Sequence, residues 1–106
     1  MTDQSETLDE RLDGEVLRLR RSGRAFARIS RDLELKRPVD AQRAFQRAVR
    51  RLPEGEQEAV REQESSRLDR LAEQVSADEG SSAEDRARRL VAIERLRNLL
   101  TPEPSA

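Results

Sequence analysis

Apolar residues recur along most of the chain at spacings of three and four, which is the period of a helix with one buried face. The first run of this kind consists of Leu8, Leu12, Val16 and Leu19. A capping-box pattern, Thr7 with Glu10, predicts where the first helix begins. Gly23 favours a left-handed helix end, so the first helix is predicted to end just before it.

Two further short helices are predicted downstream. The second covers Arg24 to Leu33, and residues 34–37 form the turn after it. Pro38 suits the first turn of the third helix, because that position needs no backbone N–H, and Pro53 ends this helix. The third helix keeps the helical period at Ala41, Ala44, Phe45, Ala48, Val49 and Leu52.

The second half of the chain predicts two longer helices. The fourth covers residues 54–76, and the fifth covers residues 83–100 after a linker that contains Gly80. Ser81 and Glu84 form a second capping-box pattern before the fifth helix. Two adjacent helices joined by a short linker are expected to pack as an antiparallel hairpin.

These elements predict an all-α protein. A three-helix domain of the helix-turn-helix type is expected over residues 8–52, followed by the helical hairpin over residues 53–100. The polar ends, residues 1–7 and 101–106, are expected to be disordered.

The residue types exclude most catalytic chemistry. The chain has no Cys and no His, so thiolate nucleophiles, the commonest general base and the commonest metal ligands are missing. Neither Ser30 nor the paired Ser65 and Ser66 has a histidine to activate it, and we expect no enzyme, catalytic residue, metal or cofactor. No apolar run is long enough to span a membrane, and the acidic start differs from a signal peptide. The expected location is therefore the cytoplasm, in a bacterium the cytoplasm or nucleoid.

The net charge of −1 conceals an uneven distribution. Residues 18–51 carry 12 basic and 3 acidic side chains, a net of +9. Residues 1–17 and residues 52–106 each carry a net of −5. A positive segment between two negative ones is typical of a protein in which one region contacts phosphate.

Three short helices with the third one basic match the plan in which the last helix enters the DNA major groove. If Phe45 points inward, Arg43 and Arg47 project outward together. Arginine and glutamine side chains read guanine and adenine edges. The predicted base-reading residues are Gln42, Arg43, Gln46 and Arg47.

Basic residues around the second helix, the turn and the end of the third helix are predicted to bind phosphates. They are Arg24, Arg28, Arg31, Lys36, Arg37, Arg50 and Arg51. With about six such contacts, the slope of log K against log salt would be on the order of −5. The near absence of aromatic residues, 2% of the chain, argues against single-stranded nucleic acid, whose bases stack on rings.

The segment RRSGRAFARISRDLELKRPVDAQRAFQRAVRRL resembles the homeodomain-like helix-turn-helix superfamily. The matching residues are Gly23, Ile29, Ser30, Leu33 and Leu35. Glu34 stands where this superfamily usually has a glycine in the turn, and Ala41 lies one position later than its usual counterpart. The resemblance implies DNA binding by the third helix, with a turn one residue longer than usual.

The segments REQESSRLDRLAEQV and RARRLVAIERLRNLL are similar to the helical hairpin of small terminase subunits of tailed phages. That resemblance implies an oligomer that presents DNA for packaging. Narrow apolar stripes on both helices also favour self-association, although the same residues suit an intramolecular hairpin. The predicted oligomerisation residues are Leu68, Leu71, Val75, Leu90, Ile93 and Leu96.

The leading functional hypothesis is a double-stranded DNA-binding protein that acts as a transcription regulator or a chromosome-associated factor and forms a homodimer or higher oligomer. One alternative is a phage-type small terminase subunit, which would form a large ring. The other is a protein-interaction module whose basic patch binds an acidic protein surface.

Overall fold

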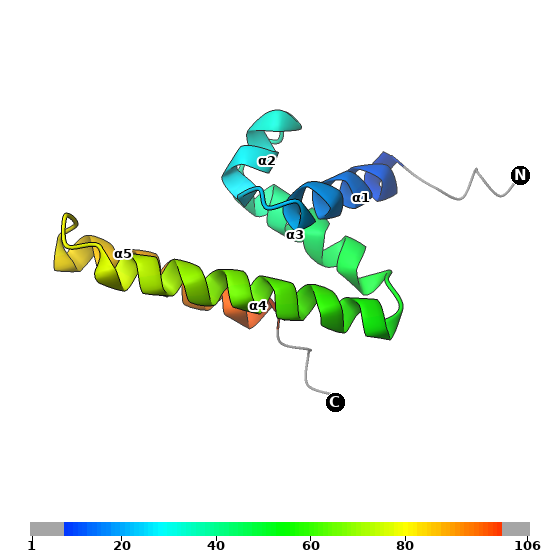
Figure 1. Ribbon diagram of the computed structural model, residues 1–106. Helices are drawn as coiled ribbons and strands as arrows, with labels where there is room; N and C mark the ends of the chain where they lie inside the picture. The colour runs from blue at the N-terminus through cyan, green and yellow to red at the C-terminus, as the bar shows by residue number, and fades with distance from the viewer. Residues whose placement is uncertain (1–7, 101–106) are drawn as a thin grey trace, which may run out of the picture. The chain divides into compact units, whose positions relative to one another are not determined.

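The computed structural model describes residues 8–100 and is all-helical over this range. It contains, in chain order, α1 (Leu8–Arg21), α2 (Phe26–Asp32), α3 (Pro38–Arg50), α4 (Glu54–Ala77) and α5 (Ala83–Leu100) (Figure 1). The chain divides into two compact units, Met1–Gln57 and Glu58–Ala106. The predicted all-α class is thus confirmed, and each helix lies within a few residues of its expected position.

In the first unit, α3 packs against both α1 and α2 (Figure 1). The buried face of α3 consists of Ala41, Ala44, Phe45 and Ala48. Three of these four residues are alanines, whose small side chains allow the helices to approach closely. Phe26 and Phe45 make an edge-to-face contact with ring centroids 5.5 Å apart, a favourable aromatic geometry. The remaining buried apolar residues come from the first two helices: Val16, Leu19 and Ile29.

The first two helices end in the same way. After α1, the N–H groups of Gly23 and Arg24 donate to carbonyls in the last turn, and Gly23 has a φ of 110°. After α2, Glu34 and Leu35 donate in the corresponding pattern, and Glu34 has a φ of 57°. Both ends are Schellman motifs, which require a left-handed residue. Glu34 therefore occupies a conformation that favours glycine, at the position where the superfamily resemblance expects one.

Specific residues mark the beginning and the end of α3. Pro38 is its first residue, and the backbone N–H of Arg37 donates to the Asp40 carboxylate at 3.1 Å, which satisfies a donor at the helix start. At the other end, the Gln57 side-chain amide donates to the Leu52 carbonyl at 2.7 Å. A side chain from the first turns of α4 thus satisfies a backbone carbonyl in the short connection that follows α3.

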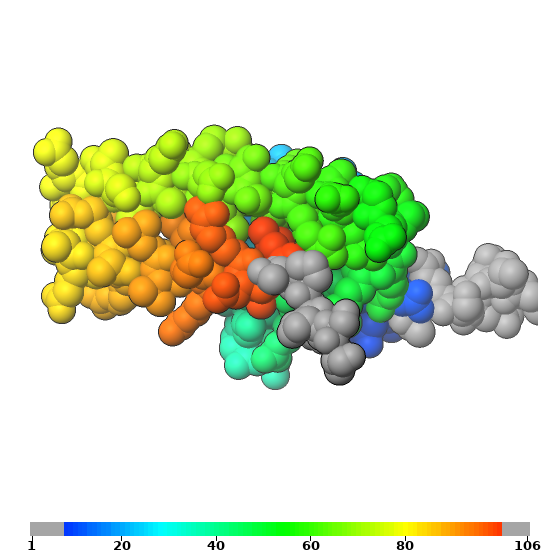
Figure 2. Space-filling view, turned by 90° about the horizontal axis from the view of Figure 1, so that it is seen from below, coloured from blue at the N-terminus to red at the C-terminus, as the bar shows by residue number. Residues whose placement is uncertain are grey.

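In the second unit, α4 and α5 lie side by side (Figure 2). Leu68, Val75 and Ile93 form the buried cluster between them. Ala72, Leu90, Leu96 and Leu100 pack around it. Ion pairs join Asp78 to Arg89 and Asp69 to Arg97, so later positions on α5 meet earlier positions on α4, and the two helices are antiparallel.

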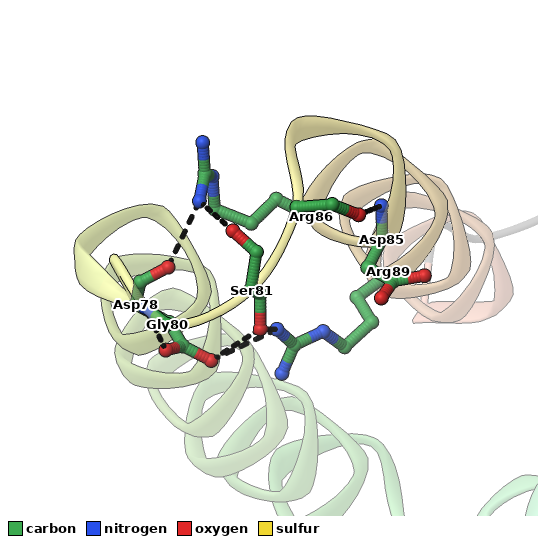
Figure 3. A network of polar contacts seen from close by, with 7 residues as sticks. Asp78, Gly80, Ser81, Asp85, Arg86 and Arg89 are labelled. Carbon is green, nitrogen blue, oxygen red and sulfur yellow. Dashed lines mark hydrogen bonds and ion pairs between the residues drawn. The ribbon is translucent and has the colours of Figure 1, made fainter.

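The loop between α4 and α5 is held by a polar network (Figure 3). Arg86 donates to the carbonyls of Asp78 and Ser81, and Arg89 binds the Asp78 carboxylate at 3.0 Å. The helix cap differs from the prediction by one residue, because the backbone N–H of Asp85 donates to the hydroxyl of Ser82. Ser81 instead binds the Asp78 carboxylate. The predicted cap at Thr7 lies outside the described residues.

Candidate nucleic-acid interface

The buried residues of α3 define which of its faces is available to a ligand. At about 100° per residue, the centre of the four buried positions lies roughly 50° from Phe45. Relative to this centre, Arg43 and Gln46 are turned outward by about 150°, and Arg47 by only about 110°. Arg43 is exposed and Gln46 is half-buried. Gln42, at about 110° on the opposite flank from Arg47, is half-buried as well.

Arg47 points toward α1 and not outward. Its guanidinium makes two hydrogen bonds to the carboxylate of Asp13, at 3.0 and 2.9 Å. Arg51 adds a third bond to the same carboxylate at 2.9 Å. The expectation that Arg43 and Arg47 project together is therefore wrong, because the prediction took Phe45 alone as the inward direction.

Asp13 is the residue of this unit that sequence reasoning missed. Its side chain has no exposed surface, and both carboxylate oxygens are bonded to arginines of α3 or its C-terminal end. Hydrogen bonds to Asp13 raise the pKa of Arg47 above its usual range, so Arg47 stays charged. A paired buried carboxylate fixes how α3 is rotated against α1. The sequence did contain one sign that Asp13 is buried. Asp13 lies three residues before Val16, so it falls on the apolar row of α1.

Arg20 is a further residue whose role the prediction missed, and it also faces the core. Arg20 lies over the ring of Phe26, with 3.9 Å between its guanidinium carbon and the ring centroid. It also donates to the carbonyl of Arg24 at 3.1 Å. This cation–π contact covers the aromatic core from the end of α1, so Arg20 has a structural role.

Several predicted phosphate-binding residues are held by carboxylates of the same unit. Arg24 and Arg28 both bind Asp32, at 2.6 and 3.2 Å. Desolvation acts to raise the pKa of Asp32, but hydrogen bonds from Arg28 and Arg24 outweigh it, and the pKa is lowered. Arg37 lies 3.6 Å from Asp40. Arg51 is bound to Asp13, and Arg50 is exposed at the outer side of α3.

Three cations of the first unit remain without an ion pair or side-chain hydrogen bond to the described residues: Arg31, Lys36 and Arg43. They lie at the end of α2, in the turn and on the outer side of α3. All three are exposed. An incoming anion could therefore bind these three cations without displacing a carboxylate of the same chain.

The predicted oligomerisation residues divide into two groups. Leu68, Val75 and Ile93 are buried within the hairpin, and Leu90 and Leu96 pack against them. These five residues form the core between the antiparallel helices α4 and α5. Leu71 differs, because 36% of its surface is exposed. Most of the predicted stripe is thus an intramolecular core.

Residues 8–100 contain no cluster of acidic side chains arranged to hold a metal ion. None of the helices in this range has an apolar stretch sufficient to cross a membrane. Comparison with protein-family models, with curated proteins and with solved structures gives no match for this chain.

Proposed function

We propose that the first unit binds double-stranded DNA, with α2, its turn and α3 acting as a helix-turn-helix and the outer side of α3 in the major groove. Such a protein would act as a transcription regulator or a chromosome-associated factor. The observation that carries the proposal is the set of three exposed cations without internal partners, Arg31, Lys36 and Arg43, around the start of α3. Cations without a carboxylate partner bind phosphate without first losing an ion pair.

Two further features support this assignment. Arg43 and Gln46 share the outward side of α3, and their side chains are those that recognise guanine and adenine edges. The α2–α3 turn contains the left-handed residue at position 34 that the superfamily resemblance expects. Base reading is accordingly proposed for Arg43 and Gln46, with Gln42 at the flank. Arg47 is assigned to holding α3 on α1.

The salt dependence of binding tests the proposal. With phosphate contacts from Arg31 and Lys36, the slope of log K against log salt should be about −2, measured by fluorescence anisotropy on a labelled mixed-sequence duplex. Each of Arg31→Gln and Lys36→Gln should reduce the steepness of that slope by about 1, whereas Arg43→Gln should relax the preference for one base. Arg95→Gln, which removes an exposed cation of α5, is the matched control and should leave the slope unchanged.

Two different results would contradict the proposal, and they can be told apart. Absence of binding at low salt, or a slope near zero, would contradict DNA binding by this unit. An equal effect of Arg95→Gln would show that the affinity depends on total charge and not on the assigned surface.

A further inference from the structure

One row of side chains on α3 faces away from the core of the first unit. Its members, at spacings of four, three and four residues, are Val39, Arg43, Gln46 and Arg50. Val39 and Arg50 are turned about 170° from the centre of the buried face of α3. Arg43 and Gln46 are turned about 150° from the same centre. The row therefore places one apolar side chain on a face that is otherwise polar.

Val39 is the member of this row without an assigned role. It is half-buried, and it is not among the residues of α3 that form the core. Valine is also a weaker helix former than arginine or glutamine, because its branched side chain loses rotamer freedom in a helix. Neither core packing nor helix formation accounts for valine at this position, whereas contact with an apolar group of a bound ligand does.

The two central residues of the row keep their polar groups available to a ligand. The side chains of Arg43 and Gln46 make no ion pair or hydrogen bond with any residue in the range 8–100. Arginine can donate to both O6 and N7 of guanine, and glutamine can form two hydrogen bonds with N6 and N7 of adenine. At the same groove edge, thymine is the base that carries a methyl group. A valine in one row with these two residues matches thymine.

The spacing of the row sets the length of DNA that it can contact. Because a helix rises about 1.5 Å per residue, Val39 and Gln46 lie about 10.5 Å apart along α3. Successive base pairs lie about 3.4 Å apart along the duplex. The three side chains therefore extend over about three base-pair steps, with Arg43 between the two ends.

We propose that α3 recognises about four consecutive base pairs, in which Val39 contacts a thymine methyl group, Arg43 binds guanine and Gln46 binds adenine. The thymine lies at the end of this block nearest the α2–α3 turn. This inference rests on the DNA binding proposed above and adds the base composition of the target. A face that bound only phosphates would gain nothing from a valine and an amide on either side of its arginine.

Replacing thymine by uracil tests the role of Val39, because the two bases differ only by the methyl group. The duplex is selected from a random pool by the unmodified chain, and it should contain thymine, guanine and adenine within about four base pairs. Uracil in place of that thymine should weaken binding about fourfold, the effect of losing one buried methyl or methylene group. Val39→Ser should bind the thymine and uracil duplexes equally. Uracil at a thymine outside the block is the control and should change nothing.

The two polar contacts are tested at their own bases. Arg43→Gln should lose about tenfold of the preference for guanine, and Gln46→Ala should lose about tenfold of the preference for adenine. Each variant should keep the preference at the other two positions. Arg95→Gln, an exposed cation of α5, should keep all three preferences. Competition between duplexes that differ at one base pair measures these ratios.

The possible failures distinguish this inference from the proposed function. Binding of DNA without a preferred sequence, or with preferences that Arg43→Gln and Gln46→Ala leave unchanged, would overturn the inference and leave DNA binding intact. Equal binding of thymine and uracil duplexes by the unmodified chain would overturn the role of Val39, whatever the stability of Val39→Ser. Absence of any duplex binding would contradict the proposed function itself.

Discussion

The two arginines one turn apart on α3 should behave in opposite ways when replaced by alanine. Arg47 donates to both oxygens of the buried Asp13 carboxylate, whereas Arg43 has no partner among the described residues. Arg47→Ala leaves Asp13 Oδ1 without a donor, and Arg51 remains bonded only to Oδ2. Arg43→Ala removes an exposed side chain and leaves no buried group unsatisfied.

The size of the stability loss expected for Arg47→Ala follows from the burial of Asp13. Leaving a buried acceptor unsatisfied costs about 1 to 3 kcal/mol of the free energy of unfolding. The larger cost of breaking a fully buried ion pair does not apply, because 44% of the Arg47 side chain is exposed and Arg51 still neutralises the carboxylate. For a domain of this size, the loss lowers Tm by roughly 5 to 20 °C. Arg43→Ala should stay within about 0.5 kcal/mol.

Thermal unfolding followed by circular dichroism, together with duplex binding at a temperature where both variants are folded, separates the two roles. Arg47→Ala should melt early and yet keep most of its DNA affinity, while Arg43→Ala should melt normally and bind weakly. Arg47→Lys is the control: lysine keeps the charge but lacks the two-pronged geometry, so it should recover only part of the Tm. If Arg47→Ala melts with the unmodified chain, the Asp13 pairing does not hold α3, and the reasoning fails.

Two further predictions concern single positions. Glu34→Gly should raise the free energy of unfolding by about 0.5 to 1 kcal/mol in urea titration, because glycine adopts the left-handed conformation without the cost that Glu34 bears. Glu34→Ala is its control and should give no gain; a glycine variant no more stable than the alanine variant would argue against a strained turn. Hydrogen bonds from Ser81 and Arg89 lower the pKa of Asp78 from its ordinary value of 3.8, so its contribution to stability is present above about pH 4 and lost as the pH falls through the lowered pKa. The difference in Tm between the unmodified chain and Asp78→Asn should be constant above about pH 5 and shrink below pH 4, and a difference independent of pH would contradict the assignment.

The helices were predictable because their boundaries depend on local chemistry. Gly23 ends α1, Pro38 begins α3, and Pro53 separates α3 from α4. Each of these residues acts through its own backbone, which a sequence displays directly. The helix cap at Ser82 was displaced by one residue, because Ser81 next to it is equally able to cap and only the loop geometry decides between them.

The direction of side chains was less predictable because it depends on distant residues. Asp13 and Arg47 are separated by 34 positions, and no periodicity within α1 or α3 relates them. A helical wheel also needs to know which direction points into the core. The prediction used the direction of Phe45 alone, and that direction differs from the centre of the buried face of α3. The same limit applies to the hairpin, where the period identified Leu68 and Leu71 alike, but packing buried one and left the other partly exposed.

The pairing of arginines within the first unit also changes how its charge should be interpreted. The net of +9 over residues 18–51 suggested about six phosphate contacts. Four carboxylates instead bind arginines of that segment, and two of the four, Asp13 and Glu15, belong to the acidic segment before it. The paired arginines are Arg18, Arg24, Arg28, Arg37, Arg47 and Arg51. A paired arginine contributes to the net charge but must lose its carboxylate before it binds phosphate, which offsets much of the gain. Clustering of basic residues therefore gives an upper bound on phosphate contacts. A slope near −2 would mean that these ion pairs persist on DNA, whereas a slope near −5 would mean that DNA displaces some of them.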